Sequence, residues 1–535
     1  MPRLLSGLPQ TYGGSAGESI IAVLEYPVKS DSTLLFERLT LIQREAPGVE
    51  VVTDEGRREV LASVGLMKRD VSHSVLGDTL AIRLLTPLNP IHGNDTINQL
   101  QSQYLKRIVR RVVDFVVESY ELAAIHVRLH PLYFLLRWLK PKLALMPSMT
   151  RLFWWLDSRD GSGEAFLSQV LARVRAALDV AAREEGLLQK AGELYALNPS
   201  RVLQARVSVP KPRLKLPFNP QVVKVVKEPR LAVDALRLIL AEVQTREPLR
   251  LENLNPDEWA YVQTMRGLQR ISQDEPLIEA VKKHLSLGDS TVKIDRKGSL
   301  LNSTYLLQIY DDGAVKDKLF VKRYFSWTDV KWVAAKLWAM PLRNFYFSPA
   351  TRMSNEIFFL NYLAEKRFRV PHVVYLSWEE KALVEDAIEG YNLTEAWTRE
   401  RARLDEGLLE RITVGAGEML ASLHEQGLVV GDCKSDNFMV SQASNEIWLV
   451  DLEQAALRGD QSWDLSELIL YMGHYLDLYE AERYASLIAR GYLSKGRPEV
   501  VESALDGKFQ LAMLPWTPIW TQVWMLRSVE RELRR

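Results

Sequence analysis

The chain has 535 residues, too many for one compact core, and at roughly 100–200 residues per domain this length predicts a multidomain protein. Its 68 lysines and arginines equal its 68 aspartates and glutamates, so the overall charge gives no sign of a strongly basic nucleic-acid binder or of an acidic tail. The single cysteine, Cys433, excludes an intrachain disulfide framework and a zinc site built from cysteines, which is typical of a reducing compartment.

The chain also shows no recognisable targeting or membrane-spanning segment. Its first residues have no continuous apolar core of signal-peptide length, and no stretch of about 18 uncharged apolar residues follows them. We therefore expect a cytoplasmic protein without a membrane span.

The pattern of the N-terminal half predicts a small α/β unit followed by helices. Over residues 1–95, strand-like runs such as "IIAVLEYPV" alternate with helix-period segments such as "RREVLASVGL". Residues 96–208 repeat apolar side chains at three- and four-residue spacing, which is typical of long amphipathic helices. The prolines of residues 209–220 predict a linker. An Asn-Pro-Asp-Glu sequence beginning at Asn255 favours a helix start within a further helical region over residues 221–285.

The C-terminal half begins with the pattern of a small antiparallel sheet. Within residues 286–390, strand-like segments are joined by a Gly-Ser turn and an Asp-Asp-Gly hairpin turn, and the helix-like stretch "TRMSNEIFFLNYLAEKRF" precedes another strand-like run. Residues 391–535 are mainly helical in pattern. The predicted fold class is therefore mixed α+β, with a β-rich part followed by a helical part at the C-terminal end.

One stretch of this second half, "VGDCKSDNFMV", gathers residue types that are used in phosphoryl transfer. Asp432, Lys434 and Asn437 form an Asp-x-Lys-x-x-Asn pattern, and Asp451 follows at the end of the apolar run "IWLV". A loop aspartate can accept or orient the proton of an attacking hydroxyl, and a nearby lysine can stabilise negative charge on the moving phosphoryl group. An asparagine and a second aspartate can supply hard oxygen ligands to Mg²⁺.

These residues resemble the catalytic segments of the atypical protein-kinase-like fold, in particular those of the RIO-type kinases and the lipopolysaccharide-kinase-like enzymes. By this resemblance, Asp432 is the catalytic base and Lys434 is the lysine that stabilises the phosphoryl group. Asn437 and Asp451 are the metal ligands by the same resemblance.

The resemblance covers about residues 285–535 and implies a bilobal kinase-like domain. The small β-rich lobe and the hinge between the lobes are expected over residues 286–390, and the large helical lobe over residues 391–535. The small α/β unit and the helical region of the N-terminal half precede this domain.

Residues upstream of the catalytic stretch follow in the order that this fold requires. Lys322 ends a strand and resembles the lysine that contacts the ATP phosphates, and Glu356 resembles its ion-pair partner. The strand-like run "KALVEDAIEG" places Glu385 and Ala387 where backbone groups of the hinge contact adenine. Downstream, Asp464 resembles the aspartate that braces the catalytic loop.

Three features depart from the family pattern. Val430 stands where a histidine commonly precedes the Gly-Asp pair. The glycine-rich loop is reduced to Gly298, with Ser299 as a side chain that can donate a hydrogen bond to phosphate. Glu453 stands in the place of the glycine that allows a backbone flip in regulated kinases, so we do not expect that flip here.

The sequence thus predicts an ATP- and Mg²⁺-dependent phosphotransferase that moves the γ-phosphoryl group to a hydroxyl, with a protein serine or threonine favoured as the acceptor. Two alternatives stay open: a kinase that acts on a small-molecule or glycolipid hydroxyl, and a pseudokinase or scaffold whose N-terminal half binds a partner. Basic and aromatic residues of the N-terminal helical region, as in "YLKRIVRRVVDFVV", are compatible with a protein partner, a membrane surface or RNA. A helical core with basic rims is the favoured explanation of these residues.

Overall fold

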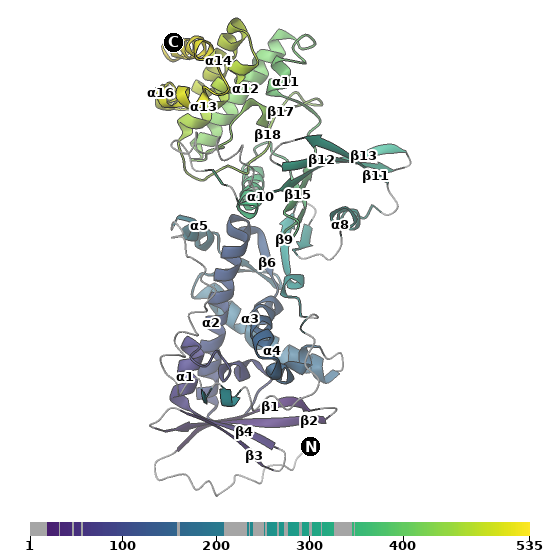
Figure 1. Ribbon diagram of the computed structural model, residues 1–535, viewed down its shortest axis with the longest axis vertical. Coiled ribbons are helices and arrows are strands. Elements are labelled where there is room, and N and C mark those ends of the chain that lie inside the picture. The colour runs from purple at the N-terminus through teal and green to yellow at the C-terminus, as the bar shows by residue number, and fades with distance from the viewer. Residues whose placement is uncertain are drawn as a thin grey trace. The chain divides into compact units, whose positions relative to one another are not determined.

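The computed structural model divides the chain into two compact units (Figure 1). Unit 1 holds Met1–Val117 and Arg128–Ala260, and unit 2 holds Glu118–Val127 and Tyr261–Arg535. The predicted linker, residues 209–220, lies outside the residues that the structure describes. Those described residues are 19–30, 33–44, 48–54, 57–157, 161–207, 233–234, 236–238, 251, 254–264, 267–271, 276–287, 291–298, 302–311, 313–325, 345–346 and 348–535.

Unit 1 opens with a five-stranded sheet. Its strands are β1 (Ser19–Ser30), β2 (Thr33–Gln43), β3 (Val49–Asp54), β4 (Arg57–Ser63) and β5 (Asn89–His92). They lie in the order β3-β4-β2-β1-β5, with β4 parallel to β2 and the other pairs antiparallel. Helix α1 (Val64–His73) begins after Ser63, whose side chain accepts a hydrogen bond from the Leu66 N–H at 3.2 Å and so caps the helix.

In the rest of unit 1, the described residues form helices and three short strands. They are the 3₁₀ helix η1 (Ala81–Leu85), α2 (Asn94–Tyr120), β6 (Val127–Leu129), α3 (Pro131–Leu145), the 3₁₀ helix η3 (Pro147–Leu156), α4 (Gly161–Arg183), β7 (Leu188–Ala191), β8 (Leu194–Leu197) and α5 (Pro199–Val207). Strand β8 pairs antiparallel with both β6 and β7. The last residues of α2 and the 3₁₀ helix η2 (Glu121–His126) belong by their contacts to unit 2.

Residues 221–285 are only partly as the sequence predicted. The Asn-Pro-Asp-Glu sequence starts a single 3₁₀ turn, η5 (Pro256–Trp259), and not a longer helix. The chain then forms the hairpin of β9 (Ala260–Thr264) and β10 (Gly267–Arg270), so the prediction of helix is wrong for these residues. The reason is that a capping sequence serves a short turn as well as a long helix, whereas the alternation of buried and exposed residues in β9 is typical of a strand. Helix α8 (Leu277–His284) follows.

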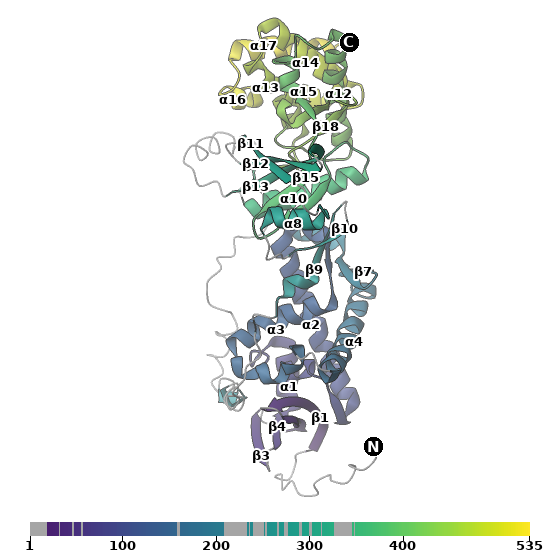
Figure 2. The same cartoon turned by 90° about the vertical axis from the view of Figure 1, so that its right-hand side faces the viewer.

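A five-stranded antiparallel sheet forms the core of the next part of unit 2. Its strands are β11 (Thr291–Gly298), β12 (Asn302–Asp311), β13 (Ala314–Tyr324), β14 (Val373–Ser377) and β15 (Ala382–Asp386), in the order β11-β12-β13-β15-β14. On one face of β13, Leu319 and Val321 form a hydrophobic core with residues of α8. Because side chains alternate along a strand, Lys322 and Tyr324 lie on the opposite face, and both bind Glu356 of helix α10 (Pro349–Glu365). Figure 2 shows α10 beside the sheet.

The remainder of unit 2 is mainly helical. Its elements are β16 (Gly390–Asn392), α11 (Leu393–Trp397), α12 (Glu406–Glu425), the 3₁₀ helix η6 (Ser435–Asn437), β17 (Phe438–Ser441), β18 (Ile447–Leu449), α13 (Gln461–Tyr471), the 3₁₀ helix η7 (Met472–His474), α14 (Leu478–Leu493), α15 (Pro498–Ala504), α16 (Gly507–Met513) and α17 (Ile519–Leu533). The predicted mixed α+β class is therefore confirmed. Among the described residues, no helix is long and apolar enough to cross a membrane.

Candidate active site

The candidate site is built around the ammonium group of Lys322, near the end of β13. Lys322 Nζ donates hydrogen bonds to Glu356 Oε1 and Oε2 at 2.9 and 2.7 Å, and to Asp451 Oδ1 at 2.5 Å. Glu356 comes from α10, and Asp451 follows β18. Three residues that are far apart in the sequence and that were predicted to act together thus meet at one buried positive charge.

The charges of this cluster shift one another's pKa values. Burial raises the pKa of Glu356 to about 7, although the neighbouring Lys322 acts to lower it. Burial also acts to raise the pKa of Asp451, but the positive charges of Lys322 and Lys434 outweigh it and lower this pKa. Burial acts to lower the pKa of Lys322, whereas the carboxylates of Asp451 and Glu356 hold it well above its usual range. The cluster therefore keeps Lys322 protonated and Asp451 ionised at neutral pH.

Two residues that the sequence did not point to complete the cluster. The hydroxyl of Tyr324 donates to Glu356 Oε2 at 2.7 Å, and Arg352 Nη1 donates to Glu453 Oε1 at 3.2 Å. Both could have been found from spacing. Tyr324 lies two residues beyond Lys322 on the same face of a strand, and Arg352 lies four residues before Glu356 on the same face of a helix.

Three carboxylates of the cluster lie close enough together to hold a cation. Ligand oxygens of Glu356, Asp451 and Glu453 are within 4.8 Å of one another. However, Lys322 already binds Glu356 and Asp451, and Arg352 binds Glu453. Glu356 is fully buried, whereas 25% of the Asp451 side chain is exposed, so Asp451 is the member of the group that can reach a ligand outside the core.

A loop over residues 430–437 carries the predicted catalytic residues, and α13 holds it in place. The two carboxylate oxygens of Asp464 accept hydrogen bonds from the backbone N–H groups of Val430 at 2.5 Å and Gly431 at 2.8 Å. One turn further along α13, Glu467 accepts a hydrogen bond from the Cys433 N–H at 2.8 Å. These charged acceptors fix the backbone on both sides of Asp432, because bonds to ionised groups are the stronger kind.

Within this loop, Asp432 and Lys434 form an ion pair. Lys434 Nζ donates to Asp432 Oδ2 at 2.9 Å, so the other carboxylate oxygen, Oδ1, is not used by this pair. The Asp432 carboxylate raises the pKa of Lys434 well above its usual range, although burial opposes the shift. Both side chains are about one quarter exposed, at 24% and 26%, and are therefore accessible to a ligand.

Asn437 links this loop to the segment of Asp451. Its side-chain Nδ2 donates to the Asp432 carbonyl oxygen at 2.8 Å, which leaves its Oδ1 as an acceptor. Its own carbonyl oxygen accepts a hydrogen bond from the Val450 N–H at 2.9 Å. The two predicted metal ligands are therefore brought together. Asp451 has a φ angle of 61°, a left-handed conformation that non-glycine residues adopt mainly where the surrounding structure enforces it.

The assignment of Glu385 and Ala387 to adenine binding stays a prediction, and the structure shows what surrounds each residue. Glu385 was expected to act through its backbone, but its side chain is buried and its Oε1 has no hydrogen-bond partner among the described residues. Burial and the nearby Glu356 carboxylate raise the pKa of Glu385 well above its usual range. Ala387 was expected to contact adenine through its backbone, but its N–H donates to the Lys318 carbonyl oxygen at 3.1 Å, because the hinge stays paired to β13. Only the Ala387 carbonyl group is left for such a contact.

The two predicted phosphate-loop residues are less informative. Gly298 is the last residue of β11 and pairs with Ser303 of β12. Ser299 lies outside the described residues. The assignment of both residues to nucleotide binding stays a prediction.

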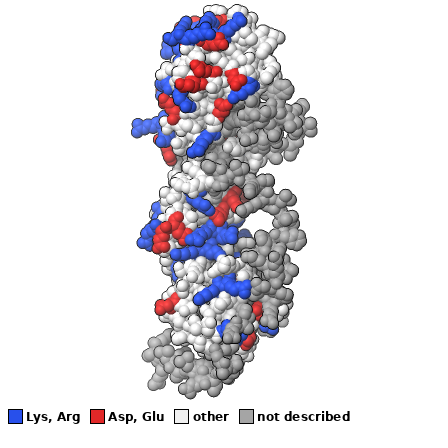
Figure 3. Space-filling model, turned by 90° about the vertical axis from the view of Figure 1, so that its left-hand side faces the viewer, with Lys and Arg blue, Asp and Glu red and all other residues white. Residues whose placement is uncertain are grey.

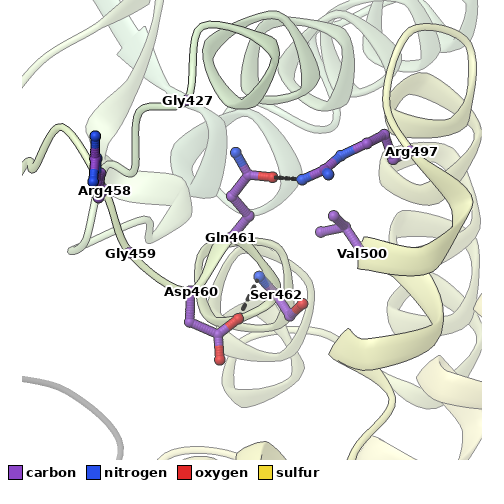
Figure 4. Close-up of a pocket in the computed structure, with 8 residues that line it drawn as sticks. All are labelled: Gly427, Arg458, Gly459, Asp460, Gln461, Ser462, Arg497 and Val500. Carbon is purple, nitrogen blue, oxygen red and sulfur yellow. Dashed lines mark hydrogen bonds between the residues drawn. The ribbon is translucent and has the colours of Figure 1, made fainter.

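A separate pocket of about 360 Å³ lies at the start of α13 (Figure 4). None of the predicted site residues lines it. Two of its polar groups hold the local structure: Asp460 Oδ1 accepts from the Ser462 N–H at 3.0 Å, and Gln461 Oε1 accepts from Arg497 Nη2 at 2.6 Å. These contacts cap α13 and attach it to α15, so we assign this pocket no part in the chemistry.

The sheet, the buried lysine cluster and the braced loop together are those of a kinase-like domain. The comparison with family models agrees, because residues 314–480 match the lipopolysaccharide kinase (Kdo/WaaP) family. This match confirms the resemblance to the lipopolysaccharide-kinase-like branch. The matched segment begins with β13 and contains Lys322, Glu356, Asp432 and Asp451.

The match covers under a third of the chain, so it says nothing of a partner for the N-terminal half. A search of curated proteins found no match.

Proposed function

We propose that the protein is an ATP-dependent kinase whose acceptor is a hydroxyl group on a sugar or glycolipid. The observation that carries the proposal is the meeting of Lys322, Glu356 and Asp451 beside the braced loop of Asp432. Burying several charges costs free energy, and only close pairing offsets this cost. A protein that merely needs a charged, solvated surface has no reason to bury such a cluster. Phosphoryl transfer does require it, since the phosphates of ATP need fixed cations and fixed oxygen ligands.

The choice of acceptor rests on the family match. The sequence by itself favoured a protein serine or threonine, with a small-molecule or glycolipid hydroxyl as the alternative. The matched family is described as lipopolysaccharide kinases, and this favours the alternative over the protein acceptor. The catalytic loop carries no information on this point, because the same residues serve either acceptor.

In the proposed reaction, Asp432 Oδ1 accepts or orients the proton of the acceptor hydroxyl. The hydroxyl oxygen forms a bond to the terminal phosphorus of ATP while the bond from this phosphorus to the bridging oxygen breaks, which gives the phosphorylated acceptor and ADP. Lys322 binds the phosphates of ATP, and Lys434, two residues from Asp432, stabilises charge on the group being transferred. Glu356 and Tyr324 position Lys322 through hydrogen bonds.

The residues of the site fit a magnesium ion by the chemistry of their donor atoms. Asp451 and Asn437 offer a carboxylate and an amide oxygen, which are hard donors, and the lowered pKa of Asp451 keeps its carboxylate available. A bound Mg²⁺ supplies positive charge that neutralises the phosphate oxygens. Lys322 binds Oδ1 of Asp451, so the other carboxylate oxygen, Oδ2, is available to bind the metal ion.

We further propose that the sheet and the helical part of unit 2 act as two lobes, with ATP bound between them. The backbone after β15 is the connection between the parts. Since the Ala387 N–H is used by Lys318, the Ile388 N–H is the donor we assign to adenine, because it has no partner among the described residues.

The test is phosphotransfer from labelled ATP by the full-length protein. Lipid extracts and purified glycolipids are compared with generic protein acceptors, and we expect transfer to the glycolipid fraction. An Asp432→Asn variant should lose at least roughly a hundredfold in rate, since general-base catalysis contributes about 10²- to 10⁴-fold. Asp405→Asn is the matched control, because Asp405 caps α12 on the surface and asparagine caps equally well.

Two results would contradict the proposal. Full activity of Asp432→Asn would contradict the mechanism. Transfer to protein acceptors alone would show that the acceptor is a serine or threonine and not a glycolipid. A pseudokinase is tested in the same preparation: if Mg-ATP does not raise the melting temperature of the wild type, the site does not bind nucleotide.

A further inference from the structure

The end of unit 2 carries an exposed apolar surface that the proposed catalysis does not use. We call it the Trp face. It is centred on Trp520, which is 64% exposed, and on Trp524, which is 45% exposed. Its residues are Trp516, Ile519, Trp520, Val523 and Trp524. Single exposed apolar residues are ordinary, but a contiguous group of this kind marks an interaction surface.

The Trp face is rigid because the opposite side of α17 is built into the protein. Met525 and Val529 are buried, and Ser528 Oγ donates to the Glu482 carbonyl oxygen of α14 at 2.9 Å. The exposed positions 519, 520, 523 and 524 therefore form one stripe at helical spacing. Because α17 is held from behind, the tryptophans project from a fixed helix.

The charges around the Trp face indicate what covers it. Residues 509–526 contain no charged side chain, whereas the chain from residue 527 to residue 535 carries Arg527, Arg531, Arg534 and Arg535 against Glu530 and Glu532. Arg527 lies over the Trp524 ring at 5.7 Å, and Arg534 is exposed. Figure 3 shows basic side chains, with acidic ones among them, at the end of unit 2 where the C-terminus lies. Tryptophan bordered by arginine is the composition of a surface that enters the interface of an anionic membrane.

The Trp face is also connected to the catalytic loop. His474 Nδ1 lies 2.9 Å from the Trp516 carbonyl oxygen, and the ring of His474 contacts that of Tyr475 at 4.9 Å. The hydroxyl groups of Tyr475 and Tyr471 are 3.3 Å apart.

The last link joins α13 to the loop itself. The Tyr471 hydroxyl donates to Asp436 Oδ2 at 3.0 Å, within the same loop as Asp432. A series of hydrogen bonds and one ring contact thus leads from Trp516 to Asp436, which lies in the same loop as Asp432.

We propose that the Trp face docks the protein on an anionic lipid surface next to its acceptor. Trp516, Trp520 and Trp524 enter the interfacial layer, and Arg527 and Arg534 bind lipid phosphates. Docking holds the loop of Asp432 beside the membrane, so that a glycolipid headgroup reaches it without leaving the bilayer. The choice of a glycolipid rests on the proposed function, whereas the docking surface itself does not.

The test is sedimentation of the full-length protein with vesicles in the absence of ATP. Vesicles of phosphatidylcholine with phosphatidylglycerol are compared with vesicles of phosphatidylcholine alone, and we expect binding to the first that weakens with salt. Trp520→Ser with Trp524→Ser should lower the binding constant at least roughly tenfold, since tryptophan carries much of an interfacial contact. Arg527→Gln with Arg534→Gln should lower binding to the anionic vesicles only.

The control is Phe36→Ser, because Phe36 is an exposed aromatic residue of β2 outside the Trp face. Melting temperatures, with and without Mg-ATP, check that every variant folds, and Trp520→Phe with Trp524→Phe should restore part of the binding. The proposal is overturned if the wild type binds neither kind of vesicle. It is also overturned if the protein with Trp520→Ser and Trp524→Ser binds vesicles as strongly as the Phe36→Ser control. It is also overturned if light scattering shows a dimer that the serine variants abolish, because a second copy then covers the face.

The outcome is separable from that of the proposed function. Asp432→Asn should bind vesicles like the wild type, since Asp432 takes no part in docking. Vesicle binding without phosphotransfer would support the docking surface and contradict the proposed kinase activity. Phosphotransfer without vesicle binding would support the kinase activity and contradict the docking surface.

Discussion

The buried charged residues of the site form ion pairs that neutralise one another. Lys322 binds two carboxylates, and Arg352 binds a third on Glu453. Removing one partner from such a group leaves an unpaired buried charge, which costs about 3–5 kcal/mol. Glu385 forms no ion pair among the described residues, and its Oε1 has no hydrogen-bond partner there. Its pKa is raised well above the usual range, which favours the uncharged carboxylic acid.

Replacing Glu385 by glutamine should therefore stabilise the protein, and increasingly so as the pH rises. The folded-state pKa of Glu385 is raised above the value of an unfolded glutamate, so the folded state binds the extra proton between the two values. In that window the free energy of unfolding of the wild type falls with rising pH, by up to about 1.4 kcal/mol per pH unit. Glutamine has no proton to lose, so the urea midpoint of Glu385→Gln should exceed that of the wild type by more at pH 8 than at pH 5.

Glu425→Gln serves as the control, because Glu425 is exposed at the end of α12 and the substitution is the same. A constant difference between Glu385→Gln and the wild type across this pH range would mean that Glu385 is ionised in the folded protein.

At the same scale, the sequence predicted some residues of the site and not others, for physical reasons. Lys322, Glu356 and Asp451 were found because each stands in a motif with a defined order along the chain. The role of the Glu385 side chain was not found, because burial depends on which face of β15 packs inward, and "ALVED" does not show this. The Trp face was not found either, since α17 is apolar on both sides and only packing decides which side is covered.

At the scale of elements, two glycines bring α12 and α14 close together behind the catalytic loop. A Cβ atom at Gly491 of α14 would overlap the Val414 carbonyl oxygen of α12, and one at Gly417 would overlap the Ile488 carbonyl oxygen. The next residue of α14, Tyr492, has its hydroxyl 2.7 Å from His424 Nδ1, near the end of α12. The helix pair therefore sets the place from which the catalytic loop begins. The sequence predicted that residues 391–535 are mainly helical, but nothing local to either glycine indicates its partner.

Gly491→Ala should separate these helices. We expect a loss of about 1–3 kcal/mol in the free energy of unfolding, the usual cost of overpacking, together with slower phosphotransfer. Thermal unfolding followed by circular dichroism measures the first effect. Gly507→Ala is the control, because a Cβ at Gly507 meets no atom within 4 Å. Equal melting temperatures for the two variants would show that α12 and α14 can move apart freely.

At the scale of the whole molecule, unit 2 is not continuous in sequence. Glu118–Val127 belongs to it although unit 1 residues separate this segment from Tyr261 onward. Ser354 of α10 makes the connection, since its Oγ donates to the Tyr120 carbonyl oxygen at 2.9 Å and accepts from the Ala123 N–H at 2.9 Å. The ring of Tyr120 contacts that of Trp378 at 4.9 Å. The sequence did not predict this arrangement, because the resemblance begins only at about residue 285 and no local pattern relates the two segments.

This arrangement makes the N-terminal segment a support for α10, the helix that carries Glu356. Ser354→Ala removes the acceptor of the buried Ala123 N–H, and we expect a loss of about 1–3 kcal/mol in the free energy of unfolding. Ser422→Ala is the control, because within the described part of the chain Ser422 Oγ bonds only the Glu418 carbonyl oxygen of its own helix.

The functional readout of the same variant is the rise in melting temperature caused by Mg-ATP. A loosened α10 holds Glu356, and through it Lys322, less firmly, so nucleotide should stabilise Ser354→Ala less than it stabilises the control. If both variants respond to Mg-ATP like the wild type, residues 118–127 support the stability of unit 2 without acting on its lysine cluster, and the nucleotide site is then set by the continuous part of unit 2 alone.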